Sequence, residues 1–79
     1  MEIKVLGSGC ANCKKLLAHA QEAVRESGAA AEVLYISDML DIVATGLMRT
    51  PGLIINGKIK AAGRIPSVKE IMEMIAAES

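Results

Sequence analysis

The sequence contains almost no aromatic residues. It has a single tyrosine, Tyr35, and neither tryptophan nor phenylalanine. It also lacks an excess of either charge, since nine basic and nine acidic side chains give a formal net charge of zero. Proteins that bind nucleic acids use basic surfaces to contact phosphates and aromatic rings to stack on bases. With neither feature present, we expect no nucleic-acid partner.

Long apolar runs are missing as well. No stretch approaches the roughly 18 consecutive apolar residues that a membrane helix needs. The chain runs from Met1 and Glu2 directly into a strand pattern, without the basic segment, apolar stretch and cleavage site of a secretory signal. We therefore expect no membrane partner and a cytoplasmic location. At 79 residues, the chain is predicted to form one domain, residues 1–79, with a small core.

Cysteine is scarce, and its two occurrences are close together. Cys10 and Cys13 stand where an N-terminal apolar strand pattern gives way to a helical one. Two thiols at this spacing at a helix start can close a small disulfide ring with little loop entropy to lose. In a reducing compartment, such a pair is typical of a catalytic or metal-binding site rather than of a structural crosslink. We expect reversible exchange between dithiol and disulfide.

The two cysteines are predicted to have different roles. Cys10 lies at the helix start, where unpaired backbone N–H groups and the helix dipole favour a thiolate and lower the thiol pKa. Cys13 lies one turn further in and is expected to be less exposed and less affected by this field. The pattern therefore predicts that Cys10 is the attacking nucleophile and Cys13 the resolving thiol.

Three other interpretations apply to the same residues. The cysteines could be inert buried side chains. They could belong to a structural zinc site, but such sites have four ligands and His19 is the only other plausible soft ligand in the chain. His19 is also expected on the exposed helix face, away from the thiols. A Cu(I) carrier suits the pair as well as redox exchange does, so these two interpretations stay open at this point.

The rest of the chain alternates between strand and helix patterns. We predict strands at 3–6, 31–36, 53–55 and 58–62, and helices at 11–27, at 39–47 and from 68 onward. Asn56-Gly57 predicts a hairpin, Ser67 with Glu70 a capping box, and 53–55 a strand buried on both faces. The order βαβαββα predicts an α/β fold with a four-stranded mixed sheet flanked by three helices. The methionines, Met39, Met48, Met72 and Met74, are expected to fill the core or its rim.

With Cys10-Ala11-Asn12-Cys13 and Thr50-Pro51 placed in this element order, the sequence resembles the thioredoxin-like superfamily. Within it, the chain is most similar to the small, glutaredoxin-sized proteins called redox-active disulfide proteins, over nearly its whole length. The resemblance implies a thioredoxin-like fold in which Pro51 is a cis-proline beside the cysteine pair and Pro66 is trans. It also implies that Thr50 and Pro51 bind substrate, with the Thr50 backbone meeting an extended segment.

The chain departs from its better-known relatives in the motif itself. Gly9 and Ala11-Asn12 replace the tryptophan and the Gly-Pro pair of thioredoxin, and these residues tune the reduction potential. The Pro-Tyr pair of dithiol glutaredoxins is absent, and Arg64-Ile65-Pro66 replaces their glutathione-binding residues. Gly7 to Cys13 is also similar to the motif of the copper-chaperone family, but that fold runs βαββαβ and ends on a strand. The present order, which ends on a capped helix, favours the redox interpretation over metal carriage and over a non-catalytic binding module.

The sequence therefore predicts a thiol–disulfide oxidoreductase or electron carrier, with a copper carrier as the alternative. Its expected partners are a disulfide-containing protein substrate and a reductase or small-thiol donor. We expect a monomer with no cofactor and no metal site.

Overall fold

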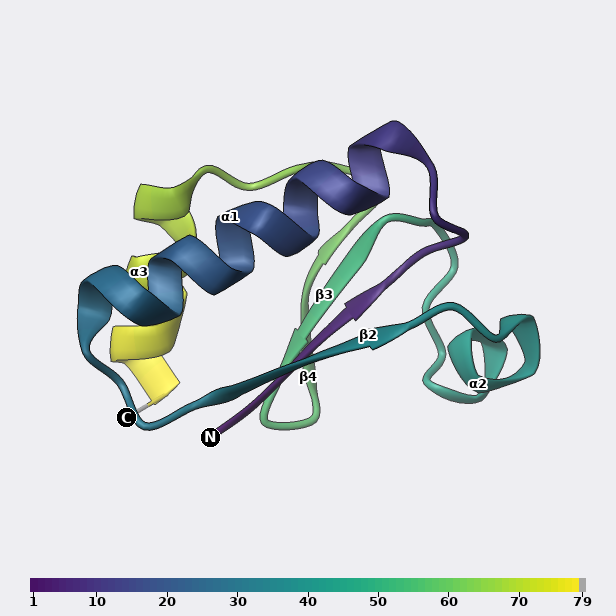
Figure 1. Ribbon diagram of the computed structural model, residues 1–79. Coiled ribbons are helices and arrows are strands. Elements are labelled where there is room, and N and C mark those ends of the chain that lie inside the picture. The colour runs from purple at the N-terminus through teal and green to yellow at the C-terminus, as the bar shows by residue number, and fades with distance from the viewer. Residues whose placement is uncertain (79) are drawn as a thin grey trace.

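The computed structural model describes residues 1–78 and shows the predicted element order, βαβαββα. The strands are β1 (Glu2–Leu6), β2 (Glu32–Ile36), β3 (Gly52–Ile55) and β4 (Lys58–Ala62). The helices are α1 (Ala11–Ser27), α2 (Met39–Ala44) and α3 (Val68–Glu78). Figure 1 shows how the three helices flank one mixed sheet, which confirms the α/β, thioredoxin-like fold expected from the sequence.

The four strands lie in the order β2-β1-β3-β4. β1 runs parallel to β2 and antiparallel to β3, and β3 runs antiparallel to β4. The parallel pair is joined through α1, because parallel strands need a long crossover connection. β1 is therefore a central strand, and the loop that leaves it for α1 lies at the opposite end of the sheet from the N-terminus (Figure 1).

Each face of the sheet has its own apolar cluster, because side chains alternate between the faces along a strand. α1 and α3 cover the face with the larger cluster, made of Ile3, Val5, Leu16, Ala20, Ala23, Leu53, Ile55, Ala61, Ile71 and Ile75. α2 and the segment after it cover the other face, where Leu6, Ile42, Leu47 and Ile54 pack together. β3 supplies residues to both clusters, so all four of its residues are buried, as predicted from its continuous apolar run.

α1 begins and ends where the sequence predicts. Cys10 is its N-cap with extended backbone, and Gly28 follows its last residue with φ of 68°, a left-handed conformation that glycine adopts readily. The Gly28 N–H donates to the carbonyl of Val24, 3.2 Å away, which closes the helix end. α1 is 17 residues long. None of the helices in the described part of the chain has the length and apolar character needed to cross a membrane.

Two further local predictions are confirmed. Asn56 and Gly57 have φ angles of 51° and 80°, the positive values that a tight hairpin between β3 and β4 requires. At the start of α3, the Glu70 N–H donates to the Ser67 hydroxyl at 3.1 Å, and the Ser67 N–H donates to the Glu70 carboxylate at 3.3 Å. This reciprocal pair is the predicted capping box.

α2 is shorter than predicted, because it ends at Ala44 and not near Leu47. The Thr45 hydroxyl donates to the Ile42 carbonyl at 2.6 Å and accepts from the Leu47 N–H at 3.3 Å. These bonds replace the next helical hydrogen bonds, and Gly46 then turns the chain with φ of 85°. The early end lets Leu47, only 6% exposed, return to the sheet.

The expectation for the methionines is wrong at two positions. Met39 is 63% exposed and Met48 is 91% exposed, whereas Met72 and Met74 are partly buried and pack against the larger cluster. A helix as short as α2 turns one residue, Ile42, fully toward the sheet. Its remaining apolar side chains are therefore left on the surface.

The expectation that His19 lies free on an exposed helix face is also wrong. His19 is half-buried, and its Nδ1 lies 3.0 Å from the carbonyl oxygen of Pro66. A carbonyl only accepts hydrogen bonds, so Nδ1 carries the hydrogen in this contact. The contact ties α1 to the segment that leads into α3.

Candidate functional site

Cys10 and Cys13 lie at the start of α1 and are joined by a disulfide bond. Their Cα atoms are 5.1 Å apart, within the usual range for a disulfide. The Cys10 sulfur also accepts a hydrogen bond from the Cys13 N–H at 3.2 Å. It thereby takes the place of an N-cap oxygen and satisfies one of the N–H groups that a helix start leaves unpaired. An N–H donor and the positive end of the helix dipole both point toward this sulfur.

The two cysteines differ in their access to solvent. Cys10 is exposed, whereas Cys13 is 0% exposed and belongs to the buried side of α1. An approaching molecule therefore meets Cys10 first. The difference follows from the helix itself, because Cys13 lies on the apolar face that packs on the sheet and Cys10 caps the end.

Gly7 makes room for the buried cysteine. A Cβ atom at this position would lie 2.7 Å from the Cys13 Cβ, closer than such atoms approach, and would also meet the Cys13 sulfur. The backbone at Gly7 is fixed, because its N–H donates to the Ile36 carbonyl of β2 at 3.0 Å. The missing side chain therefore lets the first turn of α1 pack directly onto the end of β1.

Tyr35 is a residue of the site that reasoning from the sequence missed. Its hydroxyl accepts a hydrogen bond from the Gly9 N–H at 2.8 Å, in the loop just before Cys10. The same hydroxyl lies near Gly7, 3.5 Å from where a Cβ would stand. The available signal was that Tyr35 is the chain's only aromatic residue, at the end of a strand parallel to the one that leads to the cysteines.

The Thr50–Pro51 peptide bond is cis, and it is the one such bond within residues 1–78. Pro51 is buried and Thr50 is exposed. In the antiparallel pairing of β1 with β3, Leu6 faces Gly52. Pro51 directly precedes Gly52, and Gly7 directly follows Leu6. The strand pairing therefore joins the segment that contains Pro51 to the end of β1 from which the chain continues to the cysteines.

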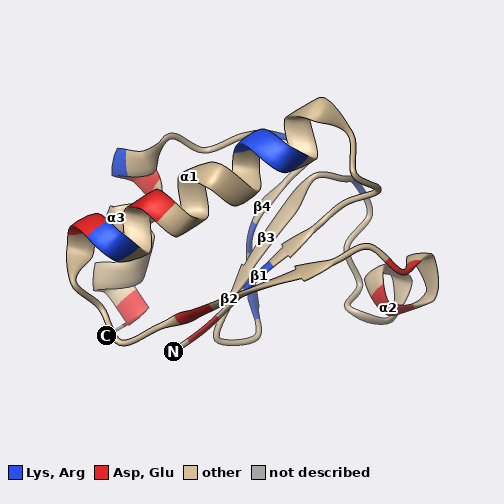
Figure 2. Ribbon diagram, viewed as in Figure 1, with Lys and Arg blue, Asp and Glu red and all other residues tan. Residues whose placement is uncertain are grey.

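The charge near the site is positive. Figure 2 shows a basic band close to the start of α1, and the sequence there contains Lys14 and Lys15, both exposed. The first turn of α1 has no acidic residue. Basic side chains near a helix start add to the field that favours an anion at the N-cap. Within residues 1–78, no group of three or more His, Cys, Asp and Glu side chains is placed to hold a metal ion.

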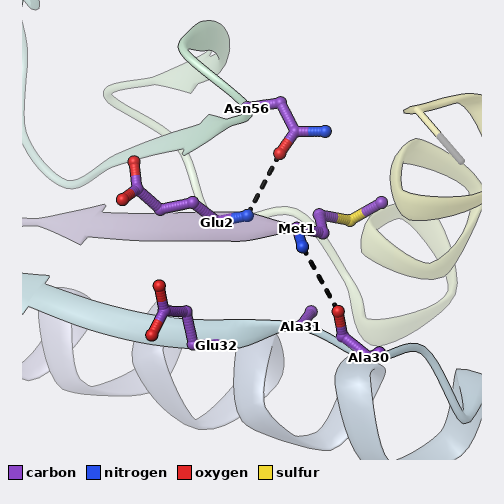
Figure 3. Close-up of a pocket in the computed structure, with 6 residues that line it drawn as sticks. All are labelled: Met1, Glu2, Ala30, Ala31, Glu32 and Asn56. Carbon is purple, nitrogen blue, oxygen red and sulfur yellow. Dashed lines mark hydrogen bonds between the residues drawn. The ribbon is translucent and has the colours of Figure 1, made fainter.

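A shallow pocket lies elsewhere, at the end of the sheet where β1 begins (Figure 3). It is lined by Met1, Glu2, Ala30, Ala31, Glu32 and Asn56. Its walls are tied by two hydrogen bonds, from the Met1 amino group to the Ala30 carbonyl at 3.2 Å and from the Glu2 N–H to the Asn56 side chain at 3.0 Å. The cysteines follow the other end of β1, so this pocket is separate from their site.

Comparison with known proteins agrees with this geometry. The sequence matches the thioredoxin domain family over residues 1–76. A thioredoxin from Methanothermobacter thermautotrophicus is 42% identical over 76 residues, which cover 96% of this chain and 99% of that protein. A thioredoxin from Methanocaldococcus jannaschii is 37% identical over 71 residues, which cover 90% of this chain and 81% of that protein. With a matching fold, a paired Cys10 and Cys13 and these relatives, the chain belongs to the thioredoxin domain family.

Proposed function

We propose that the protein is a thiol–disulfide oxidoreductase that uses Cys10 as the nucleophile and Cys13 as the resolving thiol. One observation carries the proposal: an exposed cysteine caps a helix and is bonded to a buried cysteine one turn inside that helix. The helix end stabilises negative charge on the exposed sulfur after reduction, which favours the thiolate that attacks a disulfide. The family and the relatives named thioredoxin support the same chemistry.

The reaction proceeds in two exchanges. The Cys10 thiolate attacks one sulfur of a partner disulfide, forms a mixed disulfide and expels the other partner sulfur as a thiolate. Cys13, as its thiolate, then attacks the Cys10 sulfur, which restores the Cys10–Cys13 bond and releases the second partner thiol. The partner gains two electrons and two protons, and the cysteine pair loses them. A reductase or small-thiol donor returns the pair to its dithiol form.

Thr50 and Pro51 are the proposed substrate-binding residues. The Pro51 carbonyl already accepts from the Gly63 N–H at 2.9 Å, and proline has no N–H to donate. Thr50 is exposed and precedes the buried proline, which lies just before the first residue of β3. Its backbone is therefore the part of this segment that can pair with an extended partner chain next to Cys10.

The proposed partners are disulfide-containing proteins and a reductase or small-thiol donor. We propose further that the protein acts as a monomer in the cytoplasm. Cys10 is exposed in a single copy of the chain, so the exchange needs no residue from a second copy.

A trapping experiment tests the proposal. With Cys13 changed to serine, the mixed disulfide on Cys10 cannot be resolved, so partner proteins should accumulate as covalent adducts that dithiothreitol releases. The matched control, Cys10→Ser, retains the buried thiol and should trap far less. Equal trapping by the two variants would refute the assigned roles.

A Cu(I) competition assay distinguishes the proposed redox function from the alternative, a copper carrier. The reduced protein should take up Cu(I) only incidentally from a strong chelator. Tight stoichiometric binding that is lost in both single-serine variants, together with no adducts on Cys13→Ser, would replace the redox function by metal carriage.

A further inference from the structure

We propose that Tyr35 is a positioning residue of the redox site, whose hydroxyl holds the loop before α1 so that Cys10 stays within reach of Cys13. The inference rests on the proposed exchange at the cysteine pair and assigns part of its control to a residue outside the motif. Tyr35 does not itself react, because its contact is with the backbone of Gly9 and not with a sulfur.

Tyr35 belongs to a paired strand of the sheet. Tyr35 lies near the end of β2 and pairs with Val5 of the central strand β1. Its side chain is half-buried and packs against the cluster beneath α1 and α3. A tyrosine buries its ring and keeps a polar atom at the tip, so it can carry a hydrogen bond from a packed strand to a surface loop.

The anchored segment is the exposed loop between β1 and α1. Ser8 and Gly9 are exposed, and Gly9 has φ of 85°. Glycine has no side chain whose steric contacts would hold the backbone in this conformation. The Gly9 N–H bonds to the Tyr35 hydroxyl at 2.8 Å, one residue before Cys10. The tether thus acts directly on the backbone that carries the N-cap sulfur.

The tether has different consequences in the two redox states. In the oxidised protein, the disulfide itself holds Cys10 near Cys13, so the hydrogen bond adds little restraint. In the reduced protein the disulfide is gone, and the bond from Gly9 then restrains Cys10 together with the hydrogen bond from the Lys14 N–H to the Cys10 carbonyl at 3.0 Å. Removing it frees the dithiol more than the disulfide, which lowers the effective concentration of one thiol at the other. The same freedom moves the Cys10 sulfur away from the Cys13 N–H that stabilises its thiolate.

The test compares wild-type protein with Tyr35→Phe, which keeps the ring and removes only the hydroxyl. Each protein is equilibrated with mixtures of reduced and oxidised dithiothreitol, and the fraction of disulfide is measured by thiol alkylation. The equilibrium constant for forming the Cys10–Cys13 bond should fall in Tyr35→Phe, by at most about fivefold, because the restraint that is removed is that of one hydrogen bond. The pH at which Cys10 becomes reactive toward iodoacetamide should also rise.

Ser27→Ala is the matched control, because it also removes one hydroxyl that accepts from a backbone N–H, that of Ala29 at 3.3 Å. It acts at the far end of α1 and should leave both readouts unchanged. A Tyr35→Phe protein with the wild-type equilibrium constant and the wild-type alkylation profile would overturn the inference. A wild-type protein that forms no reversible disulfide in these buffers would instead overturn the proposed function, so the two failures are distinguishable.

Discussion

Changing Gly7 to alanine tests the packing that joins β1 to the cysteine pair. The φ angle of Gly7 lies outside the left-handed region, so an alanine can adopt this backbone without strain. The cost comes from contact alone, because the new Cβ would stand 2.7 Å from the Cys13 Cβ. Neither residue can move away to relieve this contact, since Cys13 is fully buried and the Gly7 N–H is hydrogen-bonded to β2.

The magnitude follows from the cost of overpacking a filled site, about 1–3 kcal/mol for an added carbon. We expect the free energy of unfolding to fall by about 2 kcal/mol, a large part of the stability of so small a domain. With a urea m value of about 1 kcal/mol/M, the unfolding midpoint should drop by about 2 M. All measurements use dithiothreitol, so that the disulfide does not contribute.

A double-mutant cycle assigns the cost to Cys13. In a Cys13→Gly background both clashing side-chain atoms are gone, so Gly7→Ala should become nearly neutral. Gly9→Ala is the control, because a Cβ there meets nothing within 4 Å and its cost comes from a φ of 85°. That cost should be the same in both backgrounds. Close packing of Gly7 on Cys13 would be refuted if Gly7→Ala cost as much in the Cys13→Gly background as in the wild type.

Two further predictions concern contacts away from the cysteines. His19→Ala should lower the free energy of unfolding, measured in urea, by about 1 kcal/mol, because the carbonyl of the buried Pro66 loses its hydrogen-bond donor. His19→Asn restores a donor and should recover part of this loss. Equal stabilities of the wild type and the two variants would contradict the contact. The hydrogen bond from Lys60 at 2.9 Å lowers the pKa of Glu78. A lowered pKa in the folded state stabilises the protein above the unfolded value of about 4.3, and this contribution is lost as the pH falls through the folded value. The stability difference between wild type and Glu78→Gln should therefore be present at pH 6 and shrink as the pH falls below about 4.3, and a difference independent of pH would refute the ion pair.

The elements of this fold could be predicted from the sequence because their signals are local. The glycine after Ser27 ends α1, Asn56-Gly57 makes a hairpin through two positive φ angles, and Ser67 with Glu70 caps α3. Each of these depends on residues within one or two turns of each other. The same locality placed Cys10 at the helix start, where its exposure and its N–H donor follow from helix geometry.

The tertiary structure decided what depends on residues far apart in the chain. α2 ended early and left Met48 exposed, because the return of the chain to the sheet, and not helical periodicity, determined its length. His19 became half-buried because the segment before α3 packs beside it and places the Pro66 carbonyl 3.0 Å from its Nδ1. The link from Tyr35 to Gly9 and the pairing of Leu6 with Gly52, the residue after Pro51, both depend on strand pairing, since side chains on neighbouring strands meet only once the register is set. The sequence alone therefore determined where the two cysteines of the candidate site lie along the helix, whereas long-range pairing determined which backbone and side-chain groups surround them.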